Sequence, residues 1–179
     1  MSKEALLIVD MSNDFVHDEG GLTAGKPAQE IVEKIVLLAN QFLEKGDVVA
    51  ICMDEHEEND THFDIWPTHN VKGTWGQELY GTLQEWYETH KNNENVLYIG
   101  KSEYDSFYKT NLDDELKKRE VDTVHVTGVC TDICDFLTVY GAYARGYKTV
   151  AYSEGTATFT ENGPLFLEQM KQIFKTEIR

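Results

Sequence analysis

The chain has 179 residues, of which 41% are hydrophobic and 11% aromatic, so it is not a disordered protein. Its 16 Lys and Arg against 32 Asp and Glu give a net charge of -16, which makes nucleic acid and anionic membranes poor partners. No apolar run is long enough for a bilayer span, and no signal peptide is recognisable, so we expect a cytoplasmic protein.

The first predicted element is a buried strand over residues 5–9, where five apolar residues follow one another. A helix then begins at Pro27 and ends at Gly46. Its apolar residues recur at spacings of four, three and four, which places them on one face: Ile31, Ile35, Leu38 and Phe42. Residues 48–53 form the second predicted strand.

The rest of the chain continues the alternation of strands and helices. We expect further strands over 96–100, 123–127 and 148–152, and helices over 76–89, 112–120, 132–145 and 164–174. Such alternation indicates βαβ units and a parallel sheet. The predicted fold class is therefore α/β, a three-layer α/β/α sandwich with a doubly wound, mainly parallel sheet, in one domain over residues 1–179.

Polar residues follow the predicted strands where each of them ends. Asp10 ends the first strand, Asp54 the second and Lys101 the third. Cys134 lies just past the fourth strand, in the first turn of the helix that follows. Ligands of such sheets bind outside the carboxyl ends of the strands, so we expect these four groups at one edge.

Cys134 is the candidate nucleophile among three cysteines, which include Cys52 and Cys130 and should be reduced in a cytosolic chain. A thiol in the first turn of a helix lies near the positive end of the helix dipole and near unpaired N–H groups. Both favour a thiolate, and the N–H groups can bind an oxyanion. By its place alone, however, Cys134 would more often be a small buried hydrophobe.

Asp10 and Lys101 make a catalytic interpretation the better one. A carboxylate after a wholly apolar strand is costly to bury without a partner, and it could take the Cys134 proton as a general base. Lys101 could supply the compensating positive charge. The alternatives are a capping Asp10 and an exposed, snorkelling Lys101. Together the three residues predict an amide-cleaving Asp–Lys–Cys site.

A second group of residues has the composition of a metal site: Asp54, His56, His62, Asp64 and His69. An Asp and a His two residues apart at the end of a strand can turn toward one ion, and a later His can complete the ligand set. Carboxylate and imidazole ligands together suit zinc, iron or manganese. The alternative is a solvated acidic loop with incidental histidines.

With these residues in place, the sequence resembles the isochorismatase-like cysteine hydrolases, and within that family it is similar to the nicotinamidases. The resemblance covers nearly the whole chain. It rests on Lys101 and on three motifs: LIVDMSNDF at 7–15, DEHEEND at 54–60 with PTH at 67–69, and TGVCTDIC at 127–134. The metal segment separates nicotinamidases from metal-free relatives of the family.

The resemblance implies hydrolysis of the carboxamide of nicotinamide to nicotinate and ammonia, through a cysteine thioester, in NAD salvage. It implies Asp10, Lys101 and Cys134 as the catalytic triad. It further implies a cis peptide bond between Val129 and Cys130, and an oxyanion hole formed by the backbone N–H groups of Cys130 and Cys134.

For the metal, the resemblance implies one divalent ion held by Asp54, His56 and His69. A fourth ligand is expected several residues before the last histidine, and either His62 or Asp64 fits that place. We prefer His62. Zinc is the expected ion, with iron and manganese as alternatives.

For the substrate, the resemblance implies that Phe15, Trp66 and Tyr104 enclose a pyridine ring, although Trp66 could also be an ordinary core aromatic. The expected partner is a small molecule, nicotinamide and also pyrazinamide. Relatives range from monomers to tetramers, which leaves a homo-oligomer open. The remaining histidines are expected on the surface or in the core: His17, His90 and His125.

Three other functions are alternatives for this sequence. A metal-free amidohydrolase of the same superfamily would act on a carbamoyl or ureido compound. A thiol redox protein would use Cys130 and Cys134, although three residues separate them where a thioredoxin-type motif has two. A catalytically dead binding module finds no support in the sequence, because Asp10, Lys101 and Cys134 are all present.

Overall fold

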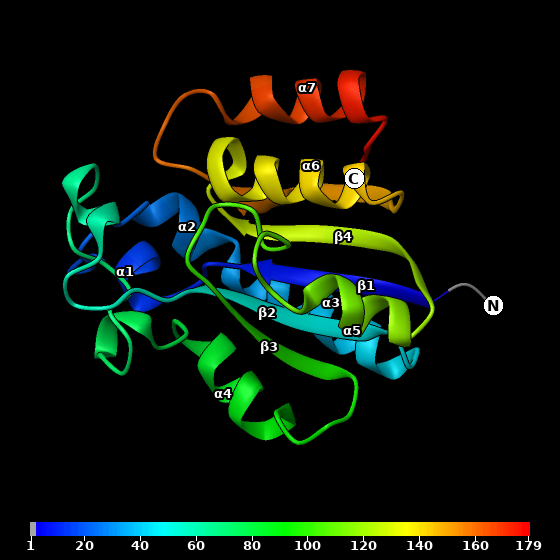
Figure 1. The fold of residues 1–179 in the computed structure, drawn as a ribbon, viewed down its shortest axis with the longest axis horizontal. Coiled ribbons are helices and arrows are strands. Elements are labelled where there is room, and N and C mark those ends of the chain that lie inside the picture. The colour runs from blue at the N-terminus through cyan, green and yellow to red at the C-terminus, as the bar shows by residue number, and fades with distance from the viewer. Residues whose placement is uncertain (1–2) are drawn as a thin grey trace.

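The computed structural model describes residues 3–179, and it contains a six-stranded sheet in the order β3-β2-β1-β4-β5-β6. Every neighbouring pair of strands is parallel (Figure 1). The strands are β1 (Lys3–Val9), β2 (Val48–Asp54), β3 (Val96–Lys101), β4 (Val121–Val129), β5 (Lys148–Ala157) and β6 (Glu177–Ile178).

Helices cover both faces of the sheet, because alternate residues of a strand point to opposite sides. Leu6 and Ile8 pack with one set of helices: α1 (Asn13–Val16), α2 (Lys26–Glu30), α3 (Val32–Glu44) and α4 (Thr82–His90). Leu7 and Val9 pack with the other set: α5 (Leu112–Lys118), α6 (Phe136–Ala144) and α7 (Gly163–Phe174). The predicted three-layer α/β/α sandwich is therefore confirmed (Figure 1).

Some predicted boundaries are wrong. The helix expected over 76–89 begins only at Thr82, after Gly81 with a φ of 57°, and residues 75–77 form a short 3-10 turn. The helix expected from Pro27 is two helices, α2 and α3, which meet at Ile31. β5 continues to Ala157, and β6, which pairs with it, was not predicted.

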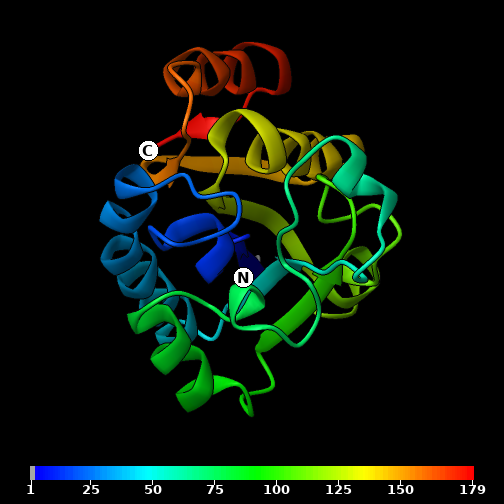
Figure 2. The ribbon, with the colours of Figure 1, turned by 90° about the vertical axis from the view of Figure 1, so that its left-hand side faces the viewer.

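The carboxyl ends of β1, β2, β3 and β4 meet at one edge of the sheet, on the left in Figure 1 and facing the viewer in Figure 2. Gly128 brings β4 close to β1 there. It has a φ of 121°, and a Cβ built on it would lie 2.1 Å from the carbonyl oxygen of Val9. Only glycine allows this conformation and this approach.

No helix within residues 3–179 has both the length and the apolar character needed to cross a membrane.

Candidate active site

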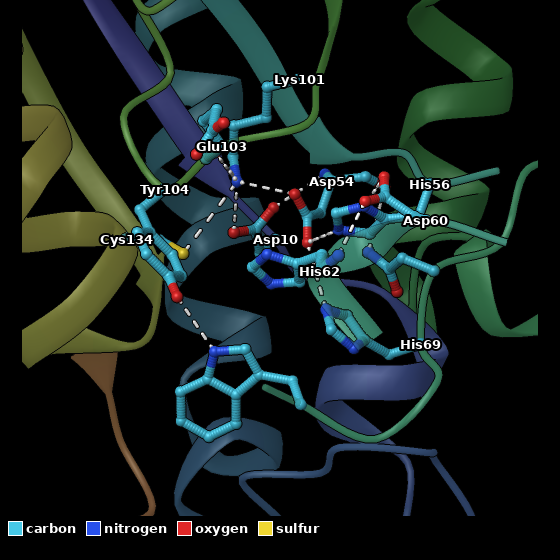
Figure 3. A network of polar contacts seen from close by, with 12 residues as sticks. Asp10, Asp54, His56, Asp60, His62, His69, Lys101, Glu103, Tyr104 and Cys134 are labelled. Carbon is cyan, nitrogen blue, oxygen red and sulfur yellow. Dashed lines mark hydrogen bonds and ion pairs between the residues drawn. The ribbon is translucent and has the colours of Figure 1, made fainter. Parts of the chain in front are cut away.

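Asp10, Lys101 and Cys134 come together at the carboxyl edge of the sheet, as the sequence predicts (Figure 3). Asp10 follows β1 and is 1% exposed. Its Oδ2 accepts a hydrogen bond from Lys101 Nζ at 2.8 Å, and its Oδ1 accepts one from the backbone N–H of Asp54 at 2.9 Å. Lys101 Nζ lies 4.0 Å from the Cys134 sulfur, and both Asp10 and Cys134 line the same cavity.

Burial of Cys134 opposes the thiolate that its place near a helix start would favour. Cys134 lies in a five-residue π-helical turn, Thr131–Asp135, ahead of α6. Burial raises its pKa well above the usual value, although the Lys101 charge opposes this. Burial also raises the pKa of Asp10, again against the opposing charge of Lys101. A buried thiol therefore faces a carboxylate whose basicity is increased.

Lys101 is a buried ammonium, so the snorkelling alternative is wrong. Burial alone would lower its pKa, but the charges of Asp10 and Asp54 outweigh burial and raise the pKa well above its usual value. Its Nζ lies 3.4 Å from Asp54 Oδ1 and donates to the backbone carbonyl of Glu103 at 3.1 Å. One cation thus compensates two buried carboxylates.

The histidines of the predicted metal segment gather beside this triad. Ligand atoms of His56, His62 and His69 all lie within 4.8 Å of one another. Asp54 Oδ2 lies 2.9 Å from His56 Nε2 and 3.4 Å from His69 Nε2. Asp64 is exposed and is not in this cluster, so the geometry favours His62 as the fourth member.

The outer nitrogens of two of these rings are held by further contacts. His56 Nδ1 lies 2.8 Å from Asp60, and His69 Nδ1 lies 2.6 Å from the carbonyl oxygen of Pro67. Their Nε2 atoms are thereby turned toward Asp54. Partners of this kind fix the tautomer and orientation of metal-binding histidines. The donor set of one carboxylate and three imidazoles therefore fits a divalent cation such as zinc.

Asn70 was not singled out from the sequence, yet it ties the two loops of this site together. It follows His69, has a φ of 46°, and its backbone N–H donates to Asp14 at 2.7 Å. Its side chain contacts the hydroxyl of Ser12 at 2.7 Å and donates to the carbonyl oxygen of Asp54 at 3.2 Å. Asn tolerates this backbone conformation better than most residues, which is the one signal the sequence carries.

Asp10, Cys134 and two of the three histidines open into one cavity at this edge. The three aromatic residues expected around the substrate all line it, and Trp66 Nε1 donates to the Tyr104 hydroxyl at 3.0 Å. The sequence reasoning missed several apolar lining residues, which belong to no recognisable motif. The cavity is lined by Asp10, Phe15, Leu22, Asp54, His62, Trp66, His69, Tyr104, Val129, Cys130, Ile133, Cys134 and Phe159.

The predicted cis peptide bond between Val129 and Cys130 is present. Burial raises the pKa of Cys130 to about 12, and that of Cys52 likewise to about 12. The histidines left outside the site lie where expected: His17 and His90 are partly exposed, and His125 is buried in the core.

The comparisons with known proteins agree with this geometry. The isochorismatase domain pattern matches residues 4–178. An uncharacterized isochorismatase family protein PncA from Bacillus subtilis is 40% identical over 164 residues, which cover 90% of this chain and 90% of the relative. The crystal structure of a pyrazinamidase/nicotinamidase from Streptococcus mutans has a TM-score of 0.96 at 38% identity, and it covers 99% of this chain and 100% of its own.

A more distant solved structure bears on the metal. The pyrazinamidase of Pyrococcus horikoshii in complex with zinc has a TM-score of 0.87 at 27% identity, over 99% of this chain and 98% of its own. The family match spans almost all of the described residues. The chain therefore belongs to the isochorismatase family, as an amidohydrolase related to its pyrazinamidases and nicotinamidases.

Proposed function

We propose that this amidohydrolase is a nicotinamidase, which hydrolyses nicotinamide to nicotinate and ammonia and serves NAD salvage. The observation that carries the proposal is the shared cavity, which Cys134 and Asp10 line together with His62 and His69 of the histidine cluster. A metal-free amidohydrolase acting on a carbamoyl or ureido compound would have no use for that cluster.

In this proposal Asp54, His56, His62 and His69 hold one divalent ion, and the ion is zinc. When bound, it supplies a Lewis-acidic contact for the ring nitrogen of the substrate. The flat aromatic walls formed by Phe15, Trp66 and Tyr104 suit a pyridine or pyrazine ring, so pyrazinamide would be accepted as well.

The chemistry begins with proton transfer from the Cys134 thiol to Asp10, and the sulfur then attacks the carboxamide carbon. The oxygen of the tetrahedral intermediate is stabilised by the backbone N–H groups of Cys130 and Cys134, at about 3–4 kcal/mol for one such donor. Asp10 returns its proton to the departing nitrogen. Ammonia leaves, and a thioester on Cys134 remains.

The second half of the reaction uses the same groups. Asp10 takes a proton from a water molecule, and the resulting hydroxide attacks the thioester carbon. The C–S bond breaks, and nicotinic acid leaves and ionises to nicotinate in solvent. Asp10 then returns the proton to the Cys134 sulfur. Lys101 remains an ammonium throughout. Its positive charge, 2.8 Å from Asp10, offsets the negative charge of the buried site.

The proposal is tested by ammonia release from nicotinamide, with and without prior treatment with a chelator. We expect turnover that the chelator abolishes and zinc restores. Cys134→Ala should lose turnover and keep its fold, measured by circular dichroism. Full activity of metal-free protein on a carbamoyl compound, or ammonia release by Cys134→Ala at the original rate, would refute the proposal.

A further inference from the structure

A segment outside the proposed catalytic groups also reaches the cavity. This segment, Thr158 to Thr160, is called the strap here. It follows β5 directly, and the last residue of β5, Ala157, pairs with Val129 next to the nucleophile segment. Phe159 of the strap lines the cavity and is 48% exposed, whereas every other lining residue is buried or half-buried. Phe159 therefore stands at the mouth.

The strap is clamped by Asp132, which lies two residues before the nucleophile. One carboxylate oxygen of Asp132 accepts a hydrogen bond from the Thr158 hydroxyl at 2.6 Å, and the other accepts one from the Thr160 hydroxyl at 2.5 Å. Bonds of this length to a charged acceptor are about twice as strong as neutral ones.

Each of the two threonine hydroxyls also accepts a second hydrogen bond, from the backbone. The Thr158 oxygen accepts the backbone N–H of Thr160 at 3.3 Å, and the Thr160 oxygen accepts that of Asn162 at 3.0 Å. The hydroxyls of Thr158 and Thr160, which flank Phe159, thus connect Asp132 to the backbone N–H groups of Thr160 and Asn162 that follow it. These hydrogen bonds hold the backbone around one half-exposed phenyl ring more firmly than packing of the chain alone requires.

We propose that Phe159 determines which ring substituents the cavity admits, and that Asp132 is the positioning residue that holds it there. The inference rests on the proposed function. If the carboxamide on ring carbon 3 lies at Cys134 and the ring nitrogen faces His62 and His69, carbon 5 is the ring atom that points away from both. The proposal places carbon 5 at the mouth, where Phe159 lies.

The specificity is tested with nicotinamide and 5-methylnicotinamide. One methyl group in an apolar pocket typically changes kcat/KM by about 10-fold or more. Phe159→Ala should therefore raise the ratio of kcat/KM for 5-methylnicotinamide to that for nicotinamide by about 10-fold. A ratio within twofold of the wild-type value would overturn the role of Phe159.

The clamp is tested with paired substitutions that differ in the hydroxyl alone. The double variant Thr158→Val with Thr160→Val removes both hydroxyls and keeps the branched side chains. It should raise the ratio of kcat/KM for 5-methylnicotinamide to that for nicotinamide, as Phe159→Ala does. It should also raise the KM for nicotinamide more than it lowers kcat. Thr158→Ser with Thr160→Ser keeps both hydroxyls and should retain the wild-type ratio. Equal ratios in the two double variants would overturn the positioning role of Asp132.

A measurement without turnover separates this inference from the proposed function. In a Phe159→Trp protein, quenching of the added indole by acrylamide should increase when both threonines are replaced by valine, and not when they are replaced by serine. Equal quenching in the two backgrounds would refute the clamp. A wild-type protein inactive on nicotinamide would refute the proposed function and the specificity role of Phe159, while quenching would still decide the clamp.

Discussion

At the scale of single residues, the site depends on one buried ammonium. Lys101 lies 2.8 Å from Asp10 and 3.4 Å from Asp54, and all three side chains are buried. Removing one partner of a buried ion pair leaves an uncompensated charge, which costs much more than the net contribution of the pair.

Lys101→Met should therefore destabilise the protein by about 3–5 kcal/mol, in addition to its effect on turnover. Lys117→Met is the matched control, because Lys117 pairs with Asp113 at 2.7 Å on the surface and such pairs contribute at most about 1 kcal/mol. Urea unfolding of both variants measures the difference. Similar losses of unfolding free energy in Lys101→Met and Lys117→Met would contradict the role assigned to Lys101.

Asp135, the residue after the nucleophile, is buried, and neither of its carboxylate oxygens has a hydrogen-bond partner among residues 3–179. Burial raises its pKa well above its ordinary value of 3.8, and the charge of Asp10 adds to this. Between these two pKa values the folded protein binds more protons than the unfolded chain, so this residue lowers stability as pH rises.

Asp135→Val should accordingly stabilise the protein at pH 8, by about 1–3 kcal/mol, since it removes an unpaired buried polar group. The gain should shrink as the pH falls toward 4, because Asp135 in the unfolded chain then also begins to bind a proton. Thermal unfolding followed between pH 4 and pH 8 measures both effects. A variant that is less stable than the wild type at pH 8 would show that Asp135 has a partner.

At the scale of elements, the site exists because four strands end at the same edge. β1 lies between β2 and β4, so Asp10 stands between Asp54 on one side and the Cys134 segment on the other. Asp54 and Lys101 face each other in register across β2 and β3. The close approach of β4 to β1 at Gly128 completes this arrangement.

Gly128→Ala should disturb this junction, because the new Cβ would meet the backbone of Val9 at 2.1 Å. Such a contact with backbone cannot relax cheaply, and we expect a loss of more than about 3 kcal/mol. Gly46→Ala is the control, since Gly46 also has a positive φ, 77°, but has nothing within 4 Å of the added Cβ. It should cost about 1 kcal/mol, measured in the same unfolding experiment.

At the scale of the whole molecule, the histidine cluster joins segments that are separate in the chain. Asp54 ends β2, His62 belongs to a 3-10 turn, Thr61–Asp64, and His69 lies in the loop that follows. A cation bound by all of them stabilises the folded protein relative to the unfolded chain, because the unfolded chain does not hold the ligands together.

Zinc at 100 times its dissociation constant should raise the free energy of unfolding by about 2.7 kcal/mol, measured by thermal unfolding with and without a chelator. His62→Ala should remove most of this gain. Asp64→Ala should keep it, since Asp64 is exposed and outside the cluster. A larger loss of the zinc-dependent gain in Asp64→Ala than in His62→Ala would indicate that Asp64 is the fourth ligand.

Some properties of this protein follow from short stretches of sequence alone. The layered fold and the polar groups after the apolar strands were predicted correctly from hydrophobic periodicity, which is local in the chain. The cis bond before Cys130 was implied by the family resemblance, and it is present. The boundaries near Gly81 and Ile31 were missed because caps and kinks depend on the packing around them.

Other properties were decided only when distant segments met. The raised pKa of the Cys134 thiol follows from how deeply the folded chain buries it. The choice of His62 over Asp64 depends on distances to His56 and His69. The clamp that joins Asp132 to the strap spans 26 to 28 residues. Burial and distance are properties of the packed molecule, so no reading of adjacent residues supplies them.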